Sequence, residues 1–104
     1  MEINVIEAKK LREKNPQHIL LDVRDRCEYE ICKIKNSINI PLSEIPQNLE
    51  KIDKNYNIII YCHHGVRSLY ALKLLQNKGF KYLYSLKGGI NEWADKIDPS
   101  IQKY

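Results

Sequence analysis

Residues 57–68 have the sequence NIIIYCHHGVRS, and this stretch decides the expected fold. The run Ile58-Ile59-Ile60 suits a strand covered on both faces, which is typical of a parallel sheet. Residues 69–78 carry leucines at helical spacing, and a glycine that suits a helix end follows them. Cys62 is therefore predicted to end a strand over 57–62 and to begin a tight loop that opens a helix.

Apolar runs and helix-like segments alternate along the rest of the chain. We predict further strands over 3–5, 18–23, 37–40 and 82–86, helices over 7–14 and 90–96, and a short helix or turn over 24–31. Ser43 suits the amino-terminal cap of another helix that reaches about Lys51. This alternation predicts an α/β fold with a mostly parallel central sheet flanked by helices on both faces. No repeat, linker or low-complexity tract interrupts it, so we expect a single domain over residues 1–104.

The composition favours a folded protein without a strong bias toward one class of partner. Hydrophobic residues make up 43% of the chain, and the net charge of +4 comes from 17 basic and 13 acidic residues that are mixed along it. No block of like charges or long apolar run is present, so we expect neither a nucleic acid nor a membrane as partner. The amino end has no signal-like core, and the cysteine count of 3 is odd. A reduced cytoplasmic protein is the expectation.

Two of the cysteines lie outside the central loop. Cys27 and Cys32 are five residues apart, so on a helix they would face different directions. Together with Cys62 they match no zinc-ligand spacing. We expect both to be structural or incidental, and the alternative is that one of them is a resolving thiol for Cys62.

The central loop combines features that favour an anionic sulfur. Backbone N–H groups at the amino end of a helix are unpaired, and the helix dipole stabilises thiolates and bound anions there. Gly65 allows a turn with positive φ that brings N–H groups together. Arg67 adds a guanidinium group that suits oxyanions. Cys62 is therefore the candidate nucleophile, although a cysteine in such a place is also compatible with a small core residue.

Neighbouring polar residues extend the candidate site. Ser68 is expected to cap the helix or to form a hydrogen bond within the loop. His63 and His64 are expected at the rim, where they would touch a substrate or add positive charge when protonated. No third ligand stands at a metal-binding spacing, so no metal is expected. Asp22 and Arg24 follow another strand, and ligands of open α/β sheets bind beyond the carboxyl ends of strands.

Four ordered blocks of this sequence together resemble the rhodanese family of sulfurtransferases in its single-domain form. They are Leu21-Asp22-Val23-Arg24 with Glu28-Tyr29, the segment from Ile34 to Leu42, the loop from Cys62 to Ser68, and Leu86-Lys87-Gly88-Gly89-Ile90 with Trp93. Two departures lie outside the loop. Cys32-Lys33 and Asn36-Ser37 stand where many relatives have Gly-His and Gly-Ala.

The resemblance implies a sulfurtransferase in which Cys62 carries sulfur as a persulfide and no cofactor takes part. Sulfur would pass from a small anionic donor such as thiosulfate to cyanide, a thiol or a protein acceptor. It also implies that N–H groups near Gly65 and Val66 hold the persulfide and that Arg67 orients the donor. Asp22 would anchor Arg67 or the loop, and Arg24 would support the same network.

Two other functions remain compatible with the sequence. One is a non-catalytic interaction module of the same family. The other is a cysteine-based phosphatase or arsenate reductase, although the phosphatases that resemble this family have one more loop residue than the four that separate Cys62 from Arg67 here. The donor stays open among thiosulfate, polysulfide and a cysteine desulfurase, and the acceptor among thioredoxin-like thiols and ubiquitin-like sulfur carriers. The oligomeric state also stays open.

Overall fold

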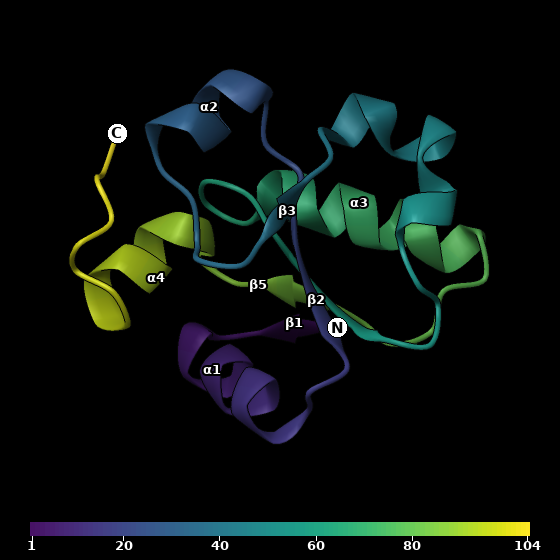
Figure 1. Cartoon of the computed structure of the whole chain (residues 1–104), viewed down its shortest axis with the longest axis horizontal. Helices are drawn as coiled ribbons and strands as arrows, with labels where there is room; N and C mark the ends of the chain where they lie inside the picture. Colours follow the sequence, from purple (N-terminus) through teal and green to yellow (C-terminus); the bar gives the residue numbers. More distant parts are fainter.

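The computed structural model describes residues 1–104 and contains one five-stranded sheet (Figure 1). All neighbouring strands run parallel, in the order β1-β5-β4-β2-β3. The strands are β1 (Glu2–Ile3), β2 (His18–Asp22), β3 (Ile38–Asn39), β4 (Asn57–Tyr61) and β5 (Leu83–Leu86). The three isoleucines of β4 are fully buried, as expected for a central strand covered on both faces.

Helices cover both faces of this sheet, which confirms the predicted fold class (Figure 1). They are α1 (Val5–Lys14), α2 (Arg26–Ile31), α3 (Val66–Asn77) and α4 (Gly89–Lys96), with two 3-10 segments, η1 (Leu42–Gln47) and η2 (Leu49–Lys51). Residues of α1 and α4 pack in one buried cluster with Leu20, Ile59 and Tyr61. Residues of α3 and η1 pack in a second cluster with Leu21, Ile58 and Ile60. Neither α3 nor any other helix has both the length and the apolar character that crossing a membrane requires.

Helix ends differ from the sequence-based expectation for local reasons. α1 starts at Val5 rather than at residue 7, because Asn4 and Glu7 form a reciprocal capping box. Residues 43–51 do not form the α-helix that we expected from Ser43. They form η1 and η2 instead, because Pro46 supplies no N–H and Asn48 ends the first segment by bonding the carbonyl groups of Glu44 and Ile45.

The strand register brings the residues that follow β2 and β4 together at the carboxyl ends of the strands. Asp22 pairs with Tyr61 across β2 and β4, and Ile60 pairs with Ser85 across β4 and β5. The Val23 N–H then donates to the Tyr61 carbonyl at 3.0 Å, so the chain leaves both strands side by side. Because the strands are parallel, Cys62 and the segment after β2 emerge at the same edge.

Candidate active site

The Cys62 sulfur is held by backbone N–H groups. Its Sγ accepts from the N–H of Gly65 at 3.1 Å and from the N–H of Ser68 at 3.4 Å, and the residue is only 1% exposed. Gly65 has φ of +109°, a left-handed conformation that the loop requires to curl back over the sulfur. The loop therefore places the thiol against the amino end of α3, where a negative charge on sulfur is stabilised.

Ser68 closes the loop from behind. Its hydroxyl donates to the Gly65 carbonyl at 3.1 Å and lies 2.7 Å from the hydroxyl of Ser85 on β5. The Cys62 thiol lies 3.7 Å from the same Ser68 oxygen. The residue at the helix cap is Gly65, so of the two roles considered for Ser68 the structure shows a hydrogen bond within the loop.

The amino end of α4 supports the other side of the loop. The N–H groups of Ile90 and Asn91 donate to the carbonyl groups of Cys62 and His63 at 2.9 and 3.2 Å. Gly89 has φ of +59°, and a Cβ there would lie 2.4 Å from both carbonyl oxygens. Only glycine at position 89 therefore lets α4 approach the loop this closely.

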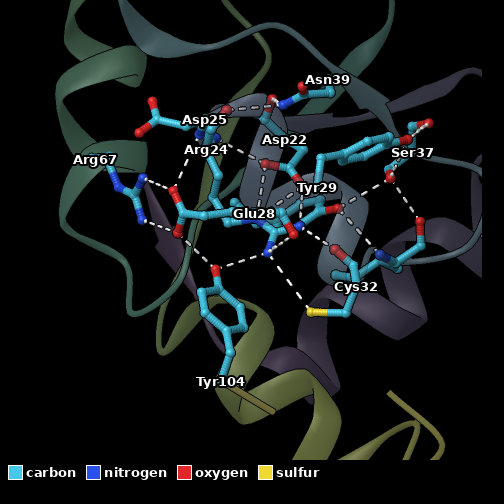
Figure 2. Close-up of polar contacts among 12 residues, drawn as sticks. Asp22, Arg24, Asp25, Glu28, Tyr29, Cys32, Ser37, Asn39, Arg67 and Tyr104 are labelled. Carbon is cyan, nitrogen blue, oxygen red and sulfur yellow. Dashed lines mark hydrogen bonds and ion pairs between the residues drawn. The ribbon is translucent and has the colours of Figure 1, made fainter. Parts of the chain in front are cut away.

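Arg67 is held by Glu28, a residue that the sequence analysis quoted but assigned no role. The two terminal nitrogens of Arg67 donate to the two carboxylate oxygens of Glu28, at 2.6 and 3.0 Å (Figure 2). This bidentate pair lowers the pKa of Glu28 to about 2, so the carboxylate is ionised at neutral pH. The same bonds raise the pKa of Arg67, and the nearby Cys62 adds to that rise.

Asp22 and Arg24 form a separate buried pair, and this corrects the expectation that Asp22 would anchor Arg67 or the loop, because its carboxylate bonds Arg24 alone. The Asp22 carboxylate accepts from the Arg24 guanidinium group, with the shortest contact at 2.6 Å, and from the Arg24 N–H at 2.8 Å. Both side chains are fully buried. Burial lowers the pKa of Arg24, but the hydrogen bonds to Asp22 and Tyr104 outweigh burial and raise it overall. The negative charge of Asp22 is therefore neutralised by Arg24, two residues away in the sequence, and not by Arg67.

Tyr104 links these ion pairs to the loop, and nothing in the sequence had marked it. Its hydroxyl accepts from Arg24 and donates to Glu28, each at 2.8 Å (Figure 2). Its ring stacks on His63 with centroids 4.0 Å apart and an angle of 8° between the planes. The contact joins positions that are far apart in sequence, so no local pattern could indicate it.

The two histidines lie at the rim, as expected, but His63 contributes little charge. Burial and the neighbouring His64 lower the pKa of His63, which favours its neutral form at neutral pH. His64 is exposed and stacks on His63 with centroids 3.9 Å apart. His63 is thus better suited to an apolar stacking contact than to the positive charge that the sequence suggested.

The remaining candidates are Val66 in the loop and the two other cysteines. The Val66 side chain is 65% exposed, and the N–H groups of Val66 and Arg67, at the start of α3, have no hydrogen-bond partner. Cys27 is exposed, and Cys32 is half-buried with its sulfur 3.8 Å from an Arg24 nitrogen. All three cysteines are free thiols. The site therefore offers one buried thiol, paired and unpaired backbone donors around it, and a nearby ion pair.

Comparison with known proteins agrees with this geometry. The family described as Rhodanese-like domain matches residues 4–96. The thiosulfate sulfurtransferase GlpE of Coxiella burnetii is 35% identical over 92 residues, covering 88% of this chain and 85% of that protein. The adenylyltransferase and sulfurtransferase UBA4 of Debaryomyces hansenii is 41% identical over 98 residues, but the match spans only 21% of its length.

Solved structures give the same result. A rhodanese-related protein from Thermoplasma volcanium superposes with a TM-score of 0.79 and 32% identity, covering 92% of each chain. A rhodanese-like domain protein from Staphylococcus aureus has a TM-score of 0.84 and 28% identity, covering 99% of this chain and 97% of that one. The family match, the relatives and the shared fold confirm the resemblance drawn from the four sequence blocks, and the chain belongs to the rhodanese-like family.

Proposed function

We propose that this protein is a sulfurtransferase, formed by residues 1–104 as one domain, that carries sulfane sulfur on Cys62. The observation that carries the proposal is the position of the Cys62 sulfur, which accepts two backbone N–H bonds at the amino end of α3. A thiolate is the reactive form of cysteine, and such donors stabilise it. The relatives named sulfurtransferases support the same reading.

The first half-reaction loads the sulfur. The Cys62 thiolate attacks the outer sulfur of a donor such as thiosulfate, and a sulfur–sulfur bond forms on Sγ. The sulfur–sulfur bond of thiosulfate breaks, and sulfite leaves with the electron pair. Unpaired N–H groups of Val66 and Arg67 belong to the same turn as those that hold Sγ, so they are available for the negative charge of the terminal sulfur.

The second half-reaction empties the site. Cyanide or a thiolate attacks the terminal sulfur of the persulfide, takes it as thiocyanate or as a new persulfide, and returns Cys62 as the thiolate. Because the two substrates react in turn with one covalent intermediate, the kinetics are expected to be ping-pong. A small anionic donor and a thiol or protein acceptor are therefore the proposed partners, and no cofactor enters either step.

Arg67 is proposed to attract the anionic donor. Glu28 binds the two terminal nitrogens of Arg67, and the Nε–H group of Arg67 forms no hydrogen bond within the protein. That donor group stays available for an oxyanion near Cys62, and the guanidinium group stays charged at every working pH. Asp22 and Arg24 are proposed to support the site from beneath, through the buried pair that Tyr104 contacts.

The test is intact mass spectrometry after treatment with thiosulfate. Wild type is expected to gain one sulfur atom that cyanide removes, and Cys62→Ser is expected to gain none. Cys27→Ser is the matched control, because it removes an exposed thiol and should leave the gain unchanged. Absence of the gain with thiosulfate and with polysulfide would contradict the proposal and would favour a non-catalytic module.

A further inference from the structure

Tyr104 lies where three separate parts of the molecule meet. Its hydroxyl oxygen is 2.8 Å from a nitrogen of Arg24 and 2.8 Å from an oxygen of Glu28, and its ring stacks on His63. Figure 2 shows its side chain reaching up from the end of the chain toward α2 and the Arg67–Glu28 pair. These contacts involve β2's flanking segment, α2 and the loop after β4. A single side chain thus bridges the surroundings of Cys62.

The contacts of Tyr104 complete a chain of interactions that starts at Arg67 and returns to the loop at His63. Arg67 bonds Glu28, Glu28 bonds Tyr104, and Tyr104 stacks on His63. His63 and Arg67 both belong to the short loop and helix start that follow Cys62, so this chain of interactions begins and ends beside the nucleophile. Glu28 is also held by the backbone N–H of Asp25, which donates to Oε1 at 3.2 Å, so removing Tyr104 would leave Oε2 with Arg67 as its only partner.

The directions of these hydrogen bonds show that the Tyr104 hydroxyl donates to Glu28. The Arg24 guanidinium group has only donors, so it donates to the Tyr104 oxygen, and the single hydroxyl hydrogen is left for Glu28. Burial raises the pKa of Tyr104 to about 12, so this hydrogen is present at neutral pH. It bonds the same Glu28 oxygen that accepts from Arg67 at 3.0 Å. The hydroxyl therefore holds Oε2 of the carboxylate that binds Arg67, while the Asp25 N–H holds Oε1.

We propose that Tyr104 is a positioning residue, which holds Glu28 so that the Arg67 charge stays beside Cys62 and favours anionic substrates. The inference deepens the proposed sulfurtransferase function and rests on it for the identity of the donor. The placement of charge near Cys62 does not depend on that identity. The two can therefore be tested separately, once with a sulfur donor and once with simple alkylating reagents.

The first measurement compares Tyr104→Phe with Tyr82→Phe in both half-reactions. Tyr82 is half-exposed and directly precedes β5, at the end of that strand away from Cys62, so its hydroxyl serves as the matched control. Tyr104→Phe keeps the ring on His63 and loses only the hydroxyl. We expect kcat/KM for thiosulfate to fall about fivefold, mainly through a higher KM, since charge-assisted hydrogen bonds are the stronger class. The thermal midpoint of Tyr104→Phe should stay close to that of wild type. Both the thermal midpoint and the kinetic constants of Tyr82→Phe should also stay close to wild type.

The second measurement needs no sulfurtransferase activity. Cys62 is alkylated with iodoacetate, which is an anion, and with iodoacetamide, which is neutral and of similar size, and the rate at the Cys62 peptide is followed by mass spectrometry. The ratio of the two rates reports the positive charge near the sulfur. We expect Tyr104→Phe to lower this ratio about threefold and Tyr82→Phe to leave it unchanged, because only the first change removes a hydrogen bond from the carboxylate that holds Arg67.

Each outcome decides the inference. An unchanged rate ratio in Tyr104→Phe overturns it, even if sulfur transfer is observed. A lowered ratio without any sulfur gain in wild type keeps the positioning role and rejects the proposed function instead. A Tyr104→Leu variant with kcat/KM above wild type would identify the ring as an obstruction and would also overturn the inference. Failure of Cys62 to react with either reagent in wild type counts against it too, because a site that favours anions must admit the smallest ones.

Discussion

The two sides of Cys62 are built from different chemistry. On the side of α3 and α4 the contacts come from the backbone. N–H groups donate to the Cys62 sulfur and to the carbonyl groups of the loop. On the side of α2, charged side chains form a network that passes from Asp22 through Tyr104 to Arg67. No charged side chain bonds the sulfur itself.

We propose that this difference separates the reactivity of Cys62 from the selectivity for its substrates. Backbone donors have fixed positions once the fold forms, so they stabilise negative sulfur without depending on side-chain conformations. The charged side chains do not bond the sulfur, and we propose that they set the field that an approaching substrate meets. Changes in the first region are therefore expected to damage the loop, and changes in the second to damage its support or its preference for anions. Four substitutions or conditions test this division.

The largest effect is expected at the buried base of the charged network. Asp22→Asn leaves the fully buried Arg24 guanidinium group without its counter-charge. We expect the free energy of unfolding to fall by about 3–5 kcal/mol, measured by urea denaturation. Glu44→Gln is the control, because it breaks an Arg–Glu pair that is largely exposed and screened by solvent, and its free energy of unfolding should stay close to wild type. Equal losses in the two variants would show that burial of the Asp22–Arg24 pair is unimportant.

The next effect tests the backbone side. Gly89→Ala places a Cβ 2.4 Å from the carbonyl oxygens of Cys62 and His63, in a left-handed conformation. We expect a loss of about 2–3 kcal/mol in unfolding free energy together with a slower alkylation of Cys62. Gly79→Ala shares the positive φ but meets only the end of a lysine side chain, at 3.4 Å. It should cost about 1 kcal/mol and leave Cys62 unaffected, so equal behaviour of both variants would contradict the close approach of α4.

A smaller effect is expected where the two sides join. Arg67→Ala removes the cation and leaves the Glu28 carboxylate without its bidentate partner, so kcat/KM for thiosulfate should fall about 30-fold with little change in stability. The double variant Arg67→Ala/Glu28→Gln also removes the stranded negative charge and should regain about threefold. Arg26→Ala breaks a comparable but exposed pair with Glu44 and should stay within about twofold of wild type. A stability loss in Arg67→Ala as large as that in Asp22→Asn would refute a role in attracting the donor.

The smallest effect is a pH dependence of stability. The pKa of Glu28 is about 2 in the folded protein against an ordinary value of 4.5, because Arg67 bonds the ionised form. The pair therefore stabilises the fold above pH 4.5, and this stabilisation is lost as the pH falls toward 2. Because the pair is partly exposed, we expect about 1 kcal/mol. Urea denaturation at pH 5 and pH 3 should show a smaller loss in Glu28→Gln than in wild type; identical losses would exclude a contribution from this carboxylate.

The sequence was most informative where function depends on local backbone. A buried strand, a cysteine, a glycine and a helix start follow one another within residues 57–68, and hydrogen bonds between near neighbours in sequence fix that geometry. Strand and helix periodicity likewise predicted the α/β class, because periodicity is a property of consecutive residues. Helix ends were less accurate, since caps such as Asn4 with Glu7 and breaks such as Pro46 depend on single side chains.

The sequence by itself therefore determined the fold class, the position of Cys62 at a strand end and the loop that surrounds it. Only the tertiary structure decided which charges meet. Asp22 pairs with Arg24 rather than Arg67, Glu28 holds Arg67, and Tyr104 contacts Glu28 from 76 positions further along the chain. The physical reason is that backbone hydrogen bonds in a turn join near neighbours, whereas the partner of a charged side chain is whichever opposite charge the packed elements bring nearest.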